Sequence, residues 1–300
     1  MGGYGWGEVQ EEDLIDAVHM ALENGITMFD TADTYGLGKS EETLGKALGT
    51  RRKDVVIATK FGVRVENGKT FYDNSPKWVR YAVEHSLKRL NTDYIDLYQV
   101  HYRDGKTSIR EIIDTLEQLK KEGKIRYYGL SNIHMADIEE LKEYKGHFVS
   151  FQDEYSLACR KNESDLLCLS KQLQLTPLTW GSLGQGILTG KYDKSCSFEM
   201  NDRRSRDIYV NFHGKKLLKN LQIVEEMRNI QKELGNSVEL SSIAIRFILD
   251  YLNDSIALAG MKNPGQVRSN CRAMDWQLTR EQIERLEIIS RDSMEEKEIT

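Results

Sequence analysis

Residues 26–36 read Ile26-Thr27-Met28-Phe29-Asp30-Thr31-Ala32-Asp33-Thr34-Tyr35-Gly36. This segment begins as a short apolar run, turns polar and ends in glycine, which predicts a buried strand, Ile26–Asp30, followed by a loop. Asp30 then stands at the carboxyl end of the strand, and Tyr35 lies on the loop. Such positions form the active sites of α/β barrels. Taken alone, the segment is equally compatible with a capping aspartate and a half-buried tyrosine.

Apolar runs of this kind alternate with segments of helical periodicity along the whole chain, which predicts parallel strands joined by helical crossovers. The expected strands are Ile26–Asp30, Val55–Lys60, Tyr94–His101, Tyr127–Ser131, Phe148–Gln152, Thr176–Trp180 and Ser255–Gly260. The expected helices are Glu11–Asn24, Ser40–Leu48, Ser75–Leu90, Ser108–Glu122, Met135–Tyr144, Glu163–Leu173, Lys215–Leu234, Leu240–Leu252, Gln266–Ala273 and Thr279–Ser290. Residues 181–214 are expected to form a long loop, and Ser40 is expected to cap the helix that it opens.

The sequence supplies seven candidate strands, whereas a closed (β/α)8 barrel needs eight. The missing strand should precede the first helix, where residues 1–7 are few and rich in glycine. We therefore expect an α/β fold, a TIM barrel truncated before or within its first strand, or a natural chain that begins upstream of Met1. An open doubly wound sheet is the alternative architecture, but no Gly-x-Gly-x-x-Gly motif follows an early strand to open a helix.

A barrel that lacks one strand leaves the edges of Ile26–Asp30 and Ser255–Gly260 unpaired. Buried unpaired backbone groups cost roughly 1–3 kcal/mol each, so the gap should not stay open. We expect residues 1–8 or a partner chain to cover it, or the mouth near Trp6 to be loose. The competing expectation is that the segment around Tyr4–Gly7 itself supplies the eighth strand.

The composition of the chain limits its partners. It has 300 residues, 39% of them hydrophobic, and a formal net charge of -5, which argues against nucleic acid as a partner. No apolar run is long enough to span a bilayer, and no charged-then-apolar leader follows Met1. The four cysteines lack the spacing of a metal site, so we expect reduced thiols and no metal ion. These features predict one domain over residues 1–300 in a cytoplasmic protein, a monomer or small homo-oligomer.

Polar or aromatic residues end successive predicted strands on their carboxyl sides. Each has a plain structural explanation by itself, such as a lysine that extends toward solvent or a polar residue that caps a strand. Their joint occurrence is more informative, because strand ends in a barrel surround one mouth and bring such residues together. They are Asp30, Lys60, His101, Ser131, Asn132, Gln152 and Trp180.

These residues lie in motifs that resemble those of the aldo-keto reductases over essentially the whole chain. The resemblance implies a (β/α)8 barrel, a nicotinamide cofactor bound without a Rossmann domain, and reduction of a small carbonyl substrate. Together the motifs are specific, although each alone is weak. They are Phe29–Gly36, Ala58-Thr59-Lys60, Val100-His101, Gly129-Leu130-Ser131-Asn132, Phe151-Gln152, the Trp180–Tyr192 stretch, and Gly260–Gln266 with Asn270.

The resemblance places the family's catalytic tetrad on Asp30, Tyr35, Lys60 and His101. Hydride attack on a carbonyl creates an alkoxide that must be protonated, and a tyrosine hydroxyl can donate that proton. A neighbouring ammonium makes the hydroxyl a stronger acid, so Lys60 would tune Tyr35 as the general acid. Asp30 would hold Lys60 in place, and His101 would orient and polarise the substrate carbonyl.

The resemblance also implies a set of cofactor contacts. Ser131, Asn132 and Gln152 match the positions that hold the nicotinamide carboxamide, and Trp180 matches the aromatic ring that stacks on the nicotinamide. Asn263-Pro264 predicts a helix start that presents free amides to a phosphate. Lys262 there matches a residue that contacts the adenosine 2′-phosphate, which favours NADPH (NADP) over NADH. The remaining expected contacts are Gly181, Ser182, Leu183, Gly184, Gly190, Gly260, Gln266 and Asn270.

Three matters stay open at the level of sequence. Ser269 replaces the usual glutamate of the family, which puts the adenine contact in doubt, and Arg268 is more simply a solvated helix charge. A cofactor-binding regulatory subunit like the potassium-channel β subunits, or an inactive truncated paralogue, are alternatives to an enzyme. The substrate is not named by the sequence, although we expect an aromatic wall. Its expected members are Trp6, Tyr35, Phe61, His101, Tyr102 and Tyr155, with Arg103 at the rim.

Overall fold

The computed structural model describes residues 5–200 and 202–291. It contains one parallel sheet with the strand order β1-β2-β5-β6-β7-β8-β9, in which each strand is hydrogen-bonded to the next. The strands of this sheet are β1 Met28–Asp30, β2 Val56–Phe61, β5 Ile95–Val100, β6 Ile125–Ser131, β7 Ser150–Glu154, β8 Thr176–Trp180 and β9 Ile256–Ala257. The predicted alternation of strands and helices and the parallel pairing are therefore confirmed.

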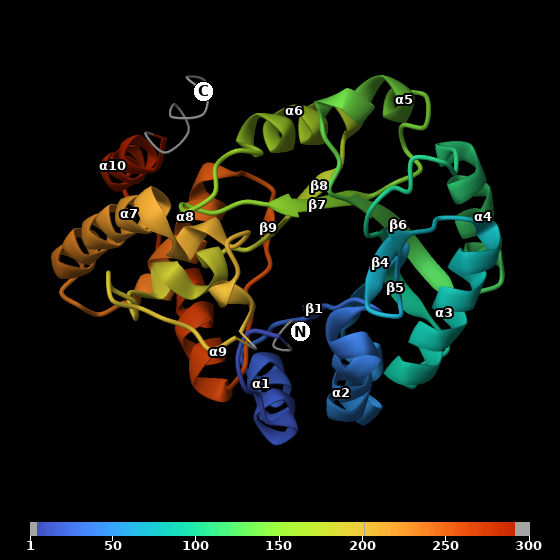
Figure 1. The fold of residues 1–300 in the computed structure, drawn as a ribbon, viewed down its shortest axis with the longest axis horizontal. Helices are drawn as coiled ribbons and strands as arrows, with labels where there is room; N and C mark the ends of the chain where they lie inside the picture. The colour runs from blue at the N-terminus through green and yellow to red at the C-terminus, as the bar shows by residue number, and fades with distance from the viewer. Residues whose placement is uncertain (1–4, 201, 292–300) are drawn as a thin grey trace.

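Helices cover the outer face of this sheet, as Figure 1 shows. They are α1 Glu11–Glu23, α2 Lys39–Leu48, α3 Pro76–Leu90, α4 Ile109–Lys121, α5 Ile138–Lys142, α6 Glu163–Leu173, α7 Gly214–Glu233, α8 Leu240–Tyr251, α9 Pro264–Cys271 and α10 Arg280–Arg291. The predicted helix over 135–144 is a 3-10 turn, Met135–Asp137, followed by the short α5. Apolar side chains between sheet and helices form one large core. No helix in the described ranges is long and apolar enough to cross a membrane.

The sheet curves like a barrel wall but is not joined between its first and last strands. Among residues 5–200 and 202–291, no strand pairs with the outer edge of β1 or of β9. The helical layer does close, because α1 packs on both α2 and α9 and so spans the seam on the outside. The structure thus confirms seven parallel strands of the expected barrel, and an upstream strand stays a prediction.

The described part of the N-terminal segment is not a strand. Residues 5–10 have no regular structure, and the Gly5 carbonyl accepts a hydrogen bond from the Arg203 amide at 3.1 Å. The Trp6 ring packs edge-on against Tyr209, with ring centroids 5.0 Å apart. The expectation that this segment supplies the eighth strand is wrong for Gly5–Gly7, because its backbone is bonded to the 202–209 loop and not to the sheet; Tyr4 lies outside the described residues.

Local sequence signals explain where α3 and α4 begin. The side chain of Ser75 accepts from the Trp78 amide at the start of α3, and Ser108 with Glu111 forms a reciprocal capping box on α4. The predicted cap of α2 is wrong. Gly38, with φ 97°, precedes that helix, and Ser40 lies inside it with its hydroxyl 2.8 Å from that of Thr31.

An antiparallel hairpin of β3 (Val63–Glu66) and β4 (Lys69–Tyr72), which was not predicted from the sequence, follows β2. Its turn residues are Asn67 (φ 51°) and Gly68 (φ 73°). Positive φ at both central positions is the geometry of a type I′ turn, for which Asn-Gly is the strongest signal. The sequence contains this turn signal, but a hairpin is predicted only when strand patterns flank the turn on both sides, and only one short pattern was evident here.

The open seam predicts that a strand pairing with both edges stabilises the protein. Each ladder hydrogen bond contributes about 0.5–1.5 kcal/mol, so an N-terminal extension that adds a hairpin and a Val- and Ile-rich strand should raise the melting temperature by about 5 °C or more. Calorimetry measures this. The control extension carries prolines in the strand, because proline cannot donate to a ladder. Equal melting temperatures for the two extended chains would contradict the prediction.

Candidate active site

The residues predicted to converge do lie at one end of the sheet. Asp30 ends β1, Lys60 lies near the end of β2, and His101 directly follows β5. Ser131 ends β6, Gln152 lies in β7, and Trp180 ends β8. Tyr35 opens a 3-10 turn, Tyr35–Gly38, after β1. These side chains and Asn132 line one cavity of about 2460 Å³, except for Lys60, which lies behind its wall. The cavity also extends along the seam between β1 and β9.

A buried ion pair stands at the centre of the site. Lys60 is 1% exposed, and its Nζ donates to Asp30 Oδ2 at 2.6 Å and to the Thr31 carbonyl at 2.8 Å. Burial alone lowers the pKa of Lys60, but the charges of Asp30 and Tyr35 and the hydrogen bond to Asp30 outweigh burial and hold that pKa above its usual value. The ammonium therefore persists at neutral pH, with Nζ 5.0 Å from the centroid of the Tyr35 ring.

His101 is held as a neutral imidazole. Burial lowers its pKa to about 3, and the Lys60 ammonium acts in the same direction. Its ring lies edge-on to Tyr35, with centroids 6.0 Å apart. Nδ1 is buried without a hydrogen-bond partner among the described residues. A buried polar atom of this kind is costly unless a ligand satisfies it, so His101 is suited to hydrogen-bond a small molecule in the cavity.

Amide side chains connect the ion pair to the next strands. Gln152 Nε2 donates to Asp30 Oδ1 at 2.8 Å, and Gln99 Nε2 donates to the same oxygen at 3.3 Å. Asn132 Nδ2 donates to the His101 carbonyl at 2.9 Å, and Ser131 Oγ donates to the Gln152 carbonyl at 3.1 Å. Asn132 has φ 53°, a left-handed conformation that asparagine tolerates. Side-chain amides are thus fixed beside Tyr35 and His101, as the sequence analysis expected.

The segment after β8 divides into residues that reach the cavity and residues that do not. Trp180, Gly181, Ser182 and Leu183 line it. Gly184 and Gly190 lie outside the cavity lining, which does not fit the contacts expected of them. Gly184 has φ 55°, and a Cβ there would lie 2.8 Å from the Cβ of Ala158, so glycine is required by packing.

A second polar group lies where α9 begins. The Asn263 side chain accepts from the Gln266 amide at 3.0 Å and caps the helix, and the Lys262 amide donates to Gln266 Oε1 at 2.9 Å. Burial, and then the nearby Arg204 guanidinium, lower the pKa of Lys262 below its usual value. Gly260 and Asn270 line the cavity here together with Ser269, whereas Arg268 is exposed and does not.

Arg204 is the functional candidate that sequence reasoning missed. Its guanidinium donates to Asp202, with Nε 2.9 Å from Oδ1, and to the Trp6 carbonyl at 3.3 Å. Lys262 Nζ donates to the same carbonyl. Arg204 and Lys262 therefore both donate to the Trp6 carbonyl, and the Asp202 carboxylate lies beside them. The adjacent charges Asp202-Arg203-Arg204 in a loop after a strand end were the available signal.

Three residues expected at the substrate wall lie elsewhere. Phe61 and Tyr155 are 0% exposed, because Phe61 packs in the core and the Tyr155 hydroxyl donates to Glu163 at 2.7 Å. Arg103 points away and pairs with Glu140 at 2.7 Å. Phe61 is the last residue of β2, where successive side chains point to opposite faces of the sheet, so it points away from the face of Lys60.

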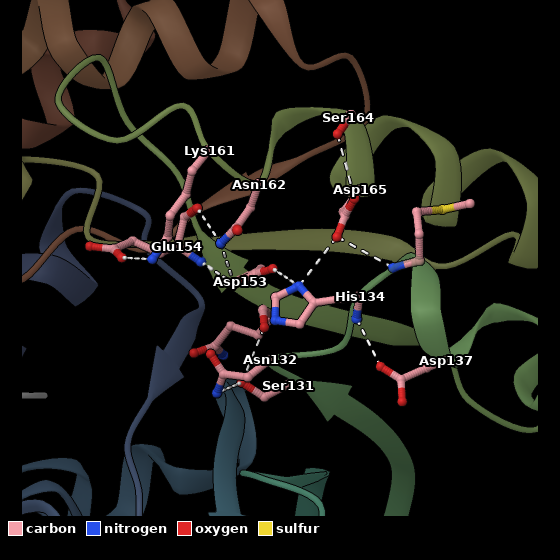
Figure 2. A network of polar contacts seen from close by, with 12 residues as sticks. Ser131, Asn132, His134, Asp137, Asp153, Glu154, Lys161, Asn162, Ser164 and Asp165 are labelled. Carbon is pink, nitrogen blue, oxygen red and sulfur yellow. Dashed lines mark hydrogen bonds and ion pairs between the residues drawn. The ribbon is translucent and has the colours of Figure 1, made fainter. Parts of the chain in front are cut away.

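A polar network behind Asn132 fixes the loop after β6 (Figure 2). The His134 ring lies between two carboxylates, with Nδ1 3.2 Å from Asp165 Oδ2 and 3.8 Å from Asp153 Oδ2. Asp153 Oδ1 accepts from Asn162 at 2.8 Å. Asp153 is 2% exposed and directly follows Gln152, so this network couples Asn132 and Gln152 to the start of α6.

Comparison with known proteins decides the family. The model of the "Aldo/keto reductase family" matches residues 1–291. The chain is 36% identical to aldo-keto reductase YhdN of Bacillus subtilis over 284 residues, 94% of this chain and 84% of that protein. The chain belongs to the aldo/keto reductase family.

Solved structures of aldo-keto reductases share the fold. The glycerol dehydrogenase AKR11B4 from Gluconobacter oxydans superimposes with a TM-score of 0.86 at 32% identity, covering 98% of this chain and 89% of that one. An aldo-keto reductase from Klebsiella pneumoniae in complex with NADPH has a TM-score of 0.74 at 25% identity, covering 96% and 88%. The predicted resemblance is confirmed, and this aldo-keto reductase is an oxidoreductase. These relatives give no support to the alternative of a channel subunit.

Asp153 predicts a pH-dependent stability. Burial raises its pKa from 3.8 to about 6, although the Glu154 amide and His134 act in the opposite direction. The pKa of Asp153 is higher in the folded state than in the unfolded chain, so the protonated carboxyl favours folding. This contribution to the free energy of unfolding is complete below about pH 4 and is lost as the pH rises through 6. Asp153→Asn, which stays neutral, should therefore stabilise the protein at pH 8 by about 1–2 kcal/mol and change little at pH 4.

Thermal melts of wild type and Asp153→Asn at the two pH values measure this difference. The exposed Asp207→Asn is the matched control and should leave the melting temperature unchanged at both. An Asp153→Asn chain that melts lower than wild type at pH 8 would show that the charged carboxylate stabilises the network.

Proposed function

We propose that this aldo-keto reductase catalyses the NADPH-dependent reduction of an aldehyde, ketone or keto-sugar carbonyl to an alcohol by hydride transfer, with Tyr35 as the general acid. The observation that carries the proposal is the buried Lys60 ammonium, which is paired with Asp30 and has its Nζ 5.0 Å from the centroid of the Tyr35 ring at the mouth of the sheet. A fixed positive charge beside a phenol stabilises the phenolate that proton donation leaves behind.

Asp30 keeps the ammonium in place. The carboxylate accepts from Lys60 on one oxygen and from Gln152 and Gln99 on the other, so it is fully engaged and cannot rotate away. Loss of one partner of a buried ion pair leaves an uncompensated charge, which is strongly destabilising. Asp30 is therefore a positioning residue, and Tyr35 is the group that exchanges a proton with the substrate.

His101 orients the substrate. As a neutral imidazole it donates one hydrogen bond without delivering a proton, so it polarises a carbonyl oxygen and leaves protonation to Tyr35. The two rings lie edge-on to each other, which allows a single oxygen in the cavity to face both side chains. A protonated histidine here would compete with Tyr35 as the acid, and its low pKa prevents this.

The residues around the cavity suit nicotinamide adenine dinucleotide phosphate. Ser131, Asn132 and Gln152 would hold the carboxamide, and the Trp180 ring would cover the nicotinamide. When bound, the reduced nicotinamide supplies the hydride. Lys262 and the capped start of α9 suit a phosphate, because cations and free helix amides both favour an anion. The similar Klebsiella pneumoniae protein, solved with NADPH, supports this cofactor.

Tyr35→Phe should lower kcat for carbonyl reduction by about 10²–10⁴-fold, the usual contribution of a positioned acid, and leave the Kd for NADPH within about threefold. NADPH oxidation with a panel of aldehydes, ketones and keto-sugars measures the first, and NADPH fluorescence titration the second. Lys60→Met should be comparably severe. Tyr127→Phe, an exposed tyrosine outside the cavity, is the matched control and should keep full activity. Turnover by Tyr35→Phe close to that of wild type would contradict the assignment of Tyr35 as the general acid.

Lys262→Glu should weaken NADPH about ten- to hundredfold, the worth of a charged hydrogen bond, while NADH weakens far less, because only NADPH carries the 2′-phosphate. Dissociation constants for both cofactors measure the ratio. Arg268→Glu reverses the same charge on the exposed face of α9 and should change neither. An equal loss of both cofactors in Lys262→Glu would remove the main support for NADPH.

A further inference from the structure

The β3–β4 hairpin presents one of its two faces to the active-site cavity. The register pairs Val63 with Tyr72 and Val65 with Thr70, so these four residues share a face, and all four line the cavity. Val65 is 42% exposed and Tyr72 47%, so apolar surface stands open toward this space. None of these residues belongs to the proposed catalytic or cofactor-holding set.

The opposite face anchors the hairpin to the body of the protein. Arg64 stacks on Trp78 of α3, with its Cζ 4.3 Å from the ring centroid, and Nη1 donates to Asp73 at 2.7 Å. Phe71 lies on this opposite face as well. The anchoring fixes which face of the hairpin the cavity meets.

The base of the hairpin is tied to the loop that carries His101. Asn74 is completely buried, and its Nδ2 donates to the Tyr102 carbonyl at 3.2 Å. Its Oδ1 accepts from the Asp104 amide at 2.8 Å. The hairpin and the residues after His101 are therefore held in one arrangement.

A row of aromatic rings runs from the proposed acid to the hairpin. After Tyr35 and His101, the rings of His101 and Tyr102 stack with centroids 5.2 Å apart, and those of Tyr102 and Tyr72 also lie 5.2 Å apart. Burial raises the pKa of Tyr102 to about 12, with the phenols of Tyr72 and Tyr35 acting in the same direction. Tyr102 thus stays an uncharged ring beside the reacting position.

Leu37 adds a second apolar element on the loop of Tyr35. It lines the cavity, is 76% exposed and has φ 54° between two glycines. An exposed leucine in the left-handed region is unfavourable both for hydration and for its backbone. Contact with an apolar group in the cavity would relieve the first of these costs.

We propose that the hairpin face of Tyr72, with Tyr102 and Leu37, is a specificity element that selects carbonyl substrates with a planar apolar group, such as aryl aldehydes, over small polyhydroxylated ones. This rests on the proposed carbonyl reduction and names its substrate class. A ring next to the carbonyl stacks along the aromatic row while the oxygen faces Tyr35 and His101. A sugar loses water from its hydroxyls on this wall without gaining matching hydrogen bonds.

Substitution of Tyr72 tests the proposal. With NADPH, Tyr72→Ala should lower kcat/KM for benzaldehyde by about three- to tenfold, the worth of an aromatic contact, and change that for glyceraldehyde less than about twofold. Tyr72→Phe should restore benzaldehyde turnover, because it keeps the ring. Phe71→Ala, the same truncation one residue earlier on the anchored face, is the matched control and should change neither. Equal losses for both substrates in Tyr72→Ala, or no loss, would overturn the proposal.

Binding provides a readout that needs no turnover. The affinity of wild type and Tyr72→Ala for benzyl alcohol, in the presence of NADP, is measured by calorimetry. Weaker binding by Tyr72→Ala but not by Phe71→Ala supports the apolar wall even if wild type reduces no carbonyl, which would overturn only the proposed function. Equal binding by all three chains would overturn the wall and leave the proposed function standing.

Discussion

The ion pair of Lys60 and Asp30 is the constraint on which the site depends. A lysine 1% exposed keeps its charge only because a carboxylate lies 2.6 Å away, and that carboxylate keeps its position only because two glutamine side chains hold its other oxygen. Side chains from four strands of the sheet, β1, β2, β5 and β7, meet in this arrangement. The curvature of the sheet therefore has a chemical role: it brings to one oxygen donors that are far apart in sequence.

The same charge also determines its neighbours. Burial, and then the Lys60 ammonium, lower the pKa of His101, and the same ammonium lies 5.0 Å from the centroid of the Tyr35 ring. Burial is the larger cause of the lowered pKa of His101, and the Lys60 charge acts in the same direction. One cation therefore faces both groups to which the proposed mechanism gives different roles, and such roles in enzymes often depend on the local environment of each group. Here both effects originate in the placement of strand ends.

The sequence predicted the alternating strands and helices along the chain, because hydrophobic periodicity is a local signal. It also predicted that the residues from Asp30 to Trp180 converge, because all of them lie at the carboxyl ends of parallel strands. It failed where tertiary contacts decide. Ser40 has a capping residue type but lies within α2, while Phe61 and Tyr155, which were expected at the substrate wall, are buried in the core. The hairpin was not predicted, although Asn67-Gly68 is a strong signal for its turn. Arg204 became a candidate only from the tertiary structure, which places its loop against Trp6 and Lys262.

Closure of the helical layer across the seam has a consequence for synthesis on the ribosome. α1 ends at Glu23, whereas its neighbour α9 begins at Pro264. At about 5–20 residues per second, α1 waits on the order of ten seconds to a minute for that neighbour to be translated. During this interval the apolar side chains of Leu14 and Val18, which are buried in the finished protein, lack the packing that α9 supplies next to α1. The nascent chain thus offers an apolar helix face to chaperones until α9 emerges from the ribosome.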